Sequence, residues 1–176
     1  MALNLKSIKG ITFDIDGVMT DGGILCIPGG DLLRTYNAKD CFAVRVAVMN
    51  GYDVGVITGG RSETIRERMN GSTGVPNENI YLGSKDKRKQ FRDFCEKHGL
   101  QPSEVMYFGD DVPDVAVMKA CGISIAPADA CIEAKEAADY VSPYPGGKGC
   151  VRHGIEMVLR SQGKWTFDAE QYEKTF

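Results

Sequence analysis

The residues best suited to chemistry are acids that directly follow short apolar segments. Asp14 and Asp16 stand in the run DIDGVMTD, just after the apolar residues 11–13. Two carboxylates two positions apart beyond a strand end face the same region, and their repulsion favours a bound cation or a shared proton. Gly17 allows the sharp turn that brings the backbone close to a ligand. A solvated turn rich in Asp and Gly is the alternative.

A second acidic run, GDDVPD, follows the apolar residues 105–108 and contains Asp110, Asp111 and Asp114. Acids clustered at a strand end favour a hard cation such as Mg²⁺, which prefers carboxylates, waters and substrate phosphate oxygens. Asp111 is also suited to capping the next helix, and Asp114 to an ordinary place in its first turn. The run predicts a metal site and leaves the roles of Asp111 and Asp114 open.

Groups that could hold an oxyanion occur in two further segments. In ITGGR, the Thr58 hydroxyl and the backbone N–H groups of Gly59 and Gly60 could bind a phosphate, as helix starts do. Beyond Gly83 stand Lys85, Lys87 and Lys89, one of which could supply a point charge beside a phosphoryl group. The other lysines of this segment belong to a solvated helix face.

The elements that would position these residues alternate along the chain. Short β-branched or aromatic runs predict buried strands over residues 11–13, 54–57, 80–82, 105–108 and 123–125. Helical patterns lie over residues 40–50, 62–69, 85–98, 113–121, 131–138 and 151–161, with a polar stretch over 70–79. This alternation predicts an α/β fold with a mainly parallel sheet. Ligands bind such sheets beyond the carboxyl ends of the strands, where Asp14, Thr58 and Asp110 are expected.

Residues 21–36 do not follow the alternation and predict a β-hairpin. Its apolar residues include Ile24, Leu25 and Leu33, and an isolated hairpin is only marginally stable in water. We therefore expect a partner subunit to cover it. One domain over residues 1–162 would contain this hairpin, and residues 163–176 would form a C-terminal tail.

Composition excludes several classes of protein. Lys plus Arg number 21 and Asp plus Glu 24, for a net charge of −3, so the broad basic surface of a nucleic-acid-binding protein is not expected. The apolar runs are shorter than the ~20 residues of a membrane helix, and the N-terminal segment lacks the pattern of a signal peptide. Six scattered cysteines without a CxxC pair predict reduced thiols in a cytoplasmic protein.

Taken together, the motifs resemble the haloacid dehalogenase (HAD) superfamily of phosphotransferases. Its four motifs match in order: the DxD acids Asp14 and Asp16, Thr58, a lysine, and GDDVPD. With YNAKD, YLG and GGKG, the sequence further resembles the 3-deoxy-D-manno-octulosonate 8-phosphate (KDO 8-phosphate) phosphatases, which are capless members. The resemblance implies a three-layer Rossmann-like fold with no cap domain, since the hairpin and single helices fill the gaps between motifs.

The resemblance also implies roles for individual residues. Asp14 would be the nucleophile that forms an aspartyl phosphate, and Asp16 the general acid and base. Mg²⁺ would be held by the Asp14 carboxylate, the Asp16 carbonyl and Asp110. Thr58 and Lys87 would hold phosphate oxygens, with Lys87 as the motif lysine in preference to Lys85.

For the residues around this centre the resemblance is less direct. Asp111 and Asp114 would orient Lys87 or metal-bound waters. Gly59, Gly60 and Arg61 would contact the substrate, and the planar Arg61 fork suits its carboxylate. Arg68 and Arg152 are the alternatives for that contact.

The implied protein is a Mg²⁺-dependent phosphatase of lipopolysaccharide precursor synthesis. It would be a homotetramer assembled through the hairpins, with a neighbour's C-terminal segment reaching the site. A phosphatase for a nine-carbon keto-sugar acid 9-phosphate is the alternative enzyme, and Gly60, where such enzymes often carry an acid, favours the eight-carbon substrate. A phosphoacceptor switch like bacterial receiver domains is a distant alternative, which the DxD acid Asp16 disfavours.

Overall fold

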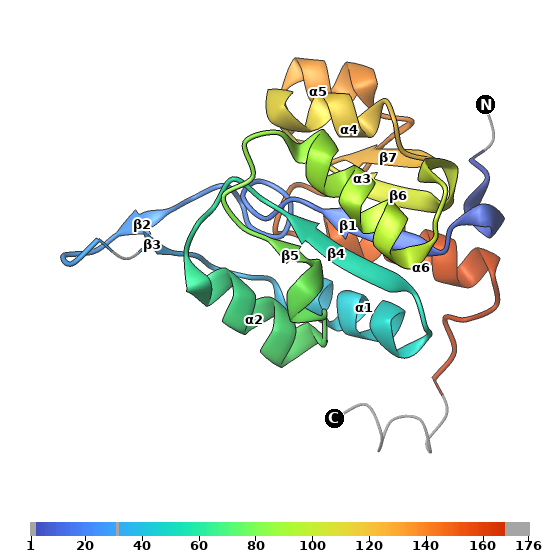
Figure 1. Cartoon of the computed structure of the whole chain (residues 1–176), viewed down its shortest axis with the longest axis horizontal. Helices are drawn as coiled ribbons and strands as arrows, with labels where there is room; N and C mark the ends of the chain where they lie inside the picture. Colours follow the sequence, from blue (N-terminus) through green and yellow to red (C-terminus); the bar gives the residue numbers. More distant parts are fainter. Residues whose placement is uncertain (1–2, 31, 168–176) are drawn as a thin grey trace.

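A single six-stranded parallel sheet forms the centre of the protein (Figure 1). The computed structural model describes residues 3–30 and 32–167. The strands lie in the order β5-β4-β1-β6-β7-β8. Their bounds are β1 (Gly10–Phe13), β4 (Asp53–Ile57), β5 (Ile80–Tyr81), β6 (Val105–Phe108), β7 (Ile123–Ala126) and β8 (Tyr140–Val141). The predicted α/β fold with a mainly parallel sheet is confirmed.

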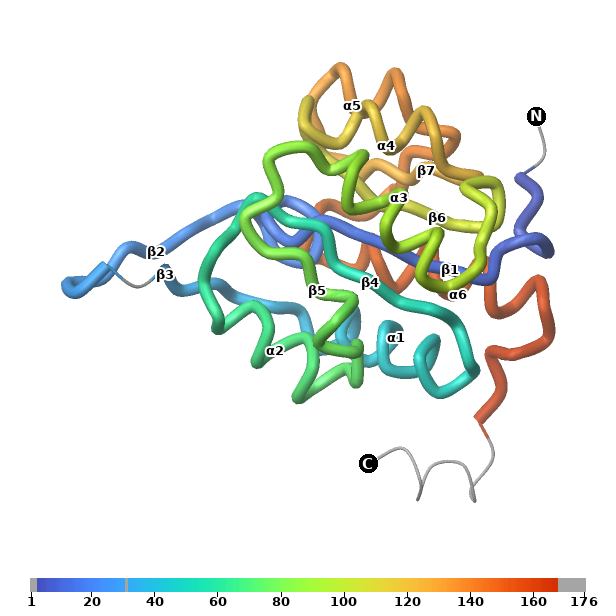
Figure 2. The backbone as a smooth tube through the Cα atoms, in the orientation of Figure 1, coloured from blue at the N-terminus to red at the C-terminus, as the bar shows by residue number. Residues whose placement is uncertain are grey.

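Helices cover both faces of the sheet, as the backbone trace shows (Figure 2). On one face α1, α2 and α6 pack together, and on the other α3, α4 and α5 do so. The helices are α1 (Ala38–Met49), α2 (Glu63–Thr73), α3 (Lys87–His98), α4 (Val115–Met118), α5 (Ile132–Ala137) and α6 (Cys150–Ser161). In the part of the chain that is described, four short 3-10 turns supplement them: Leu5–Ser7, Asn77–Asn79, Pro102–Glu104 and Val112–Asp114.

The apolar strands divide their side chains between two cores, one on each face. Met106 and Phe108 of β6 join the core beneath α1 and α6, whereas Val105 and Tyr107 join the core beneath α3 and α4. This alternation is the period of two that a strand imposes. Because both faces are covered, the four residues of β6 are all buried, which explains their continuous apolar run.

The strands β2 (Leu25–Cys26) and β3 (Leu32–Leu33) form a hairpin that follows β1 and its turn in the chain. It projects away from the sheet beyond the carboxyl ends of the strands (Figure 1). Between β1 and β4 the described chain contains this hairpin and α1, and between β4 and β6 it contains α2, β5 and α3. In the part of the chain that the structure describes, no cap domain stands over the sheet.

Two helix ends differ from the prediction. We expected a short helix over residues 62–69 and a polar stretch after it, but α2 continues to Thr73 and ends at Gly74, whose φ of 77° is left-handed. The Thr73 hydroxyl is buried and donates to the Met69 carbonyl, so its polarity does not end the helix. The helix expected over 113–121 is shorter, because Val112–Asp114 form a 3-10 turn before α4.

Two predictions from composition concern the cysteines and membrane-spanning helices. All six cysteines lie among the described residues and are free, as expected. No helix in the described ranges has both the length and the apolar character needed to cross a bilayer.

Candidate active site

The sheet topology creates a crevice beside β1. The chain runs from β1 to β4 and β5 on one side, and from β6 to β7 and β8 on the other. The connections from neighbouring strands therefore leave in opposite directions at the carboxyl end of β1, which is where parallel sheets bind ligands. A cavity of about 320 Å³ lies there. Its lining contains most of the predicted residues: Asp14, Asp16, Thr58, Gly59, Gly60, Lys87, Asp110, Asp111 and Asp114, together with Ser84, Lys85 and Pro113.

Asp14 is the first residue beyond β1, and the sheet fixes its backbone. Its N–H donates to the Phe108 carbonyl of β6 at 3.1 Å, and its Oδ1 accepts from the Ile15 N–H at 2.7 Å. The chain then turns tightly at Gly17, whose φ is 86°. A Cβ added at Gly146 would lie 1.9 Å from the Gly17 carbonyl oxygen, so the GGKG segment supports this turn from behind at a distance that only glycine permits.

Lys87 bridges two buried carboxylates at the start of α3. Its Nζ lies 2.6 Å from Asp14 Oδ2 and 2.7 Å from Asp114 Oδ1. The predicted Asp114 therefore contacts Lys87 directly, and it also accepts from the N–H groups of Asp110 and Asp111. The hydroxyl of buried Tyr107, on β6, donates to the same carboxylate. With four donors around it, Asp114 fixes Lys87 beside Asp14.

The electrostatics of this cluster are dominated by burial. Burial raises the pKa of Asp14 to about 6, although Lys87 opposes the shift. Burial, reinforced by Asp114 and Asp14, raises the pKa of Asp110 to about 7. Burial by itself would lower the pKa of Lys87, but the two neighbouring carboxylates outweigh it and the pKa is raised. Lys87 therefore stays charged while the acids around it carry more negative charge than it can balance.

The acids fit a hard divalent cation. One carboxylate oxygen from each of Asp14, Asp110 and Asp114 lies within 4.8 Å of the others. Asp110 Oδ1 is buried and has no hydrogen-bond partner, whereas the oxygens of Asp114 already accept several donors. Asp14 and Asp110 are therefore better placed than Asp114 to bind a cation, and the ligand roles that the resemblance implies for them stay predictions. A Cβ at Gly17 would come 2.0 Å from Asp110 Oδ2, so this position needs glycine.

The oxyanion side of the cavity is formed by the turn after β4. Thr58 is buried, and its Oγ1 accepts from the Gly60 N–H at 3.1 Å. The Ser84 N–H donates to the Thr58 carbonyl and the Gly83 N–H to the Gly60 carbonyl, which ties the turn to the segment that precedes α3. Two parts of the expected phosphate site are thus held together by backbone hydrogen bonds.

The predicted lysine and arginine candidates lie in different surroundings. Lys85 lines the cavity but is exposed, and the lysine in contact with Asp14 is Lys87. Arg61 is exposed, and its side chain passes close to Gly83 outside the cavity lining. Arg68 lies over the Tyr36 ring, and Arg152 pairs with a glutamate one helical turn further along α6. In this single chain, none of the three arginines lines the cavity beside Asp14.

Two residues near the site were not predicted from the sequence. Tyr107 is two residues before Gly109 on an apolar strand, so it looked like an ordinary core residue. Arg34 of the hairpin forms a two-pronged ion pair with Asp16, with Nε–Oδ1 2.6 Å and Nη2–Oδ2 2.9 Å. Strand periodicity could have placed Tyr107 on the α3 side of the sheet, but no sequence signal reveals where the hairpin directs Arg34.

Comparisons with known proteins agree with this geometry. A family model of haloacid dehalogenase-like hydrolases matches residues 62–152. The 3-deoxy-D-manno-octulosonate 8-phosphate phosphatase KdsC of Escherichia coli K12 is 35% identical over 159 residues, which cover 90% of this chain and 83% of that protein. The same-named phosphatase of Moraxella catarrhalis, solved with a magnesium ion, a phosphate ion and KDO, matches with a TM-score of 0.86 and 27% identity over 98% of this chain and 95% of that one. The cobalt-bound deoxy-D-mannose-octulosonate 8-phosphate phosphatase of Haemophilus influenzae matches with a TM-score of 0.89 and 31% identity, over 97% and 96% of the two chains.

Proposed function

Because the chain belongs to the haloacid dehalogenase-like hydrolases, and among them to the KDO 8-phosphate phosphatase family, we propose that it hydrolyses 3-deoxy-D-manno-octulosonate 8-phosphate to the free sugar acid and phosphate. The observation that carries this proposal is the buried ion triad in which Lys87 joins Asp14 to Asp114, beside the unpartnered oxygen of Asp110. Such a cluster suits a phosphomonoester that arrives with a divalent cation.

In the proposed mechanism the Asp14 carboxylate attacks phosphorus. A bond forms between an Asp14 oxygen and phosphorus as the bond from phosphorus to the sugar oxygen breaks, and Asp16 gives its proton to that oxygen. Asp16 then takes a proton from water, whose oxygen attacks phosphorus and releases Asp14. Lys87 and Thr58 hold the phosphoryl oxygens.

The residues suited to Mg²⁺ are Asp14, Asp110 and the backbone carbonyl of Asp16. When bound, the cation offsets the repulsion between the acids and the phosphate and stabilises charge on the phosphoryl oxygens. Asp114 does not need to bind it, because its four donors already occupy its oxygens. Asp111 is exposed and caps the turn Val112–Asp114, which leaves it free to orient waters at the rim.

A phosphate-release assay tests the proposal. The wild-type protein with Mg²⁺ should release phosphate from the eight-carbon ester faster than from a nine-carbon keto-sugar acid 9-phosphate or from simple sugar phosphates. A preference for the nine-carbon ester would overturn the substrate assignment. Asp14→Asn should abolish turnover with the fold retained, and chelation should silence the enzyme until Mg²⁺ is restored.

A lasting phosphoprotein without phosphate release would instead indicate the phosphoacceptor switch. The Asp16 side chain lies in the same cavity as Asp14, which supports an enzyme that hydrolyses its own intermediate.

We further propose a homotetramer assembled through the hairpins of a cytoplasmic enzyme of lipopolysaccharide precursor synthesis. In support, Leu25 of the hairpin is 63% exposed, and Ile24 and Leu33 are also exposed. Leu25→Glu should lower the mass measured by light scattering, while Ile132→Glu, at an even more exposed apolar residue on α5, should not. An unchanged mass for Leu25→Glu would contradict assembly through the hairpin.

The division into a domain over 1–162 and a tail over 163–176 remains part of the proposal. Trp165 packs edge-on against Phe42 of α1, which holds the start of the tail against its own chain. The tail over residues 163–176 is proposed to reach a neighbour's site, and its residues 168–176 lie outside the described residues.

A further inference from the structure

The carboxylate of Asp16 is held by the hairpin and not by the sheet. Every hydrogen bond that its side chain makes within the described ranges comes from Arg34, one residue beyond β3. Both carboxylate oxygens are engaged, at 2.6 Å and 2.9 Å, and Arg34 Nη1 also donates to the Leu32 carbonyl at 3.3 Å. This planar fork fixes the plane of the carboxylate as well as its position.

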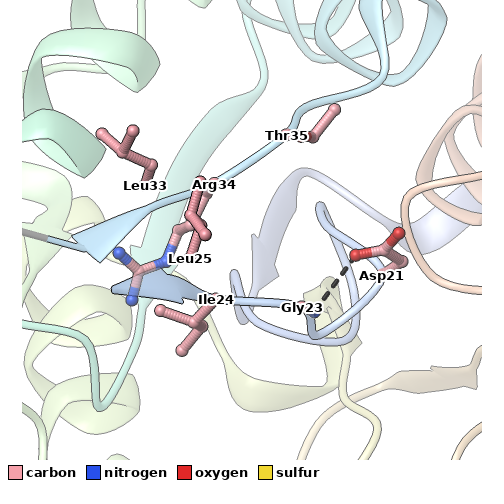
Figure 3. A pocket seen from close by; sticks show the side chains of 7 residues that line it. All are labelled: Asp21, Gly23, Ile24, Leu25, Leu33, Arg34 and Thr35. Carbon is pink, nitrogen blue, oxygen red and sulfur yellow. Dashed lines mark hydrogen bonds between the residues drawn. The ribbon is translucent and has the colours of Figure 1, made fainter. Parts of the chain in front are cut away.

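The Arg34 side chain is buried although the neighbouring hairpin is exposed. The Arg34 side chain is 2% exposed, whereas the hairpin carries Leu25 and Leu33 in the open. Figure 3 shows Arg34 among the residues that line a pocket beside the hairpin, together with Ile24 and Leu25. An ion pair with one partner sheltered from water keeps its geometry better than an exposed pair does.

Gly60 provides part of the space for this side chain. A Cβ added there would lie 3.2 Å from Arg34 Nη2 and 2.7 Å from Ile65 Cδ1. The guanidinium therefore lies between Asp16 and the turn that contains Thr58, at the rim of the active-site cavity.

We propose that Arg34 is a positioning residue for the reaction, which holds the Asp16 carboxylate in the orientation required to give a proton to the leaving oxygen. The inference rests on the proposed phosphatase function. Each carboxylate oxygen has a second lone pair, so the fork leaves positions that can carry the proton. Because Asp16 has no other anchor among the described residues, loss of Arg34 frees its side chain to rotate, and proton transfer loses its alignment.

A comparison of two leaving groups tests this role. An alkyl oxygen, as in KDO 8-phosphate, needs a proton to leave, whereas the p-nitrophenolate of p-nitrophenyl phosphate leaves as a stable anion. The measured quantity is kcat/KM, which reports formation of the aspartyl phosphate and is insensitive to its later hydrolysis. Arg34→Gln should lower kcat/KM for the alkyl ester by about 10- to 100-fold, part of the ~10²–10⁴-fold that general acids supply, and for the aryl ester by less than about 3-fold.

Controls separate positioning from folding and from charge. Arg92→Gln, at an exposed arginine on α3, should leave both esters unaffected. Arg34→Lys should recover little of the alkyl activity, because an ammonium cannot form the fork. Added to Asp16→Asn, which already lacks the acid, Arg34→Gln should cause no further loss on the alkyl ester.

Equal losses on the two esters would overturn the proposal and assign Arg34 a structural role, as would full recovery by Arg34→Lys. If Arg34→Gln lowered kcat/KM for the alkyl ester by the same factor in the Asp16→Asn background as in the wild type, the proposal would be overturned as well, since Arg34 would then act independently of Asp16. A wrong substrate assignment would be seen separately, because the wild type would then release no phosphate from the sugar acid ester but would hydrolyse other alkyl phosphates. The comparison of alkyl and aryl esters would then be made with those alkyl phosphates.

Discussion

The replacement Asp110→Asn should stabilise the metal-free protein at high pH while abolishing its response to Mg²⁺. Asp110 ionises with a pKa of about 7, raised from 3.8 mainly by burial and then by Asp114 and Asp14. The fold therefore favours the protonated acid. This contribution to stability is complete below about pH 4 and is lost as the pH rises through 7.

The size of the effect follows from the shift. A displacement of ~3 pKa units corresponds to about 4 kcal/mol of unfolding free energy at pH 8. Asp110 is only partly buried and solvent screens its charge, so we expect ~1–2 kcal/mol to be observed. Asparagine has the same shape and does not ionise. The free energy of unfolding of Asp110→Asn should therefore exceed that of the wild type by this amount at pH 8, with a smaller gap at pH 5.

Urea unfolding at pH 5 and pH 8, in chelator and in Mg²⁺, measures both the stability of the metal-free protein and its response to Mg²⁺. The wild type should gain ~2.7 kcal/mol when Mg²⁺ is at 100 times its Kd, and the variant should gain much less. Asp21→Asn serves as the matched control, because Asp21 is exposed, lies outside the active-site cavity, and asparagine can also accept the Gly23 N–H. A variant that is less stable than the wild type at pH 8 in chelator, or a stability difference that narrows with rising pH, would contradict a raised pKa at Asp110.

Three further single-residue replacements should change the stability of the protein or its response to Mg²⁺. Lys87→Ala leaves two buried carboxylates without their cation, so urea unfolding at pH 8 should reveal a loss of ~3–5 kcal/mol, and a loss below 1 kcal/mol would contradict the ion triad. Gly17→Ala should remove the Mg²⁺-dependent thermal shift, because its Cβ would meet Asp110, whereas Gly29→Ala, also at positive φ but with nothing within 4 Å, should retain it at a cost of ~1–2 kcal/mol. Asp40→Ala should lower stability by ~2–4 kcal/mol in thermal unfolding, because Asp40 is buried and accepts two N–H groups at the start of α6, and Asp40→Asn should lose less.

The parts of the site that lie on strand ends were predictable, because the sheet itself brings them together. Asp14, Thr58 and Asp110 each follow an apolar run, and parallel strands align their carboxyl ends whatever the intervening chain does. The motif lysine could be narrowed only by resemblance, since Lys85 and Lys87 follow Gly83 by two and four residues and nothing else in the sequence separates them. The first residue of α3 points inward, and that helix phase selects Lys87.

The contacts that escaped prediction depend on tertiary geometry. Tyr107 occupies a position that the apolar pattern of the strand assigns to the core. Its hydroxyl reaches Asp114 only because the 3-10 turn Val112–Asp114 brings that carboxylate next to β6. Arg34 reaches Asp16 because the chain returns past that residue directly after β3, a path that no local pattern specifies. The extension of α2 to Thr73 escaped for a simpler reason: polar residues in its last turn are satisfied by the helix itself.

The sheet holds Asp14 and the hairpin holds Asp16, so the two residues are positioned by different parts of the fold. The proposed nucleophile Asp14 is held by β6, by Lys87 and by a glycine turn, so it is anchored directly to the sheet. The proposed acid Asp16 instead depends on a two-stranded hairpin that buries little apolar surface of its own. A partner that covers Leu25 would stabilise the hairpin and, through Arg34, the orientation of Asp16. Assembly and proton transfer are then linked by one arginine, so Leu25→Glu should lower kcat/KM for an alkyl phosphate more than for an aryl phosphate, the same signature as that expected of Arg34→Gln.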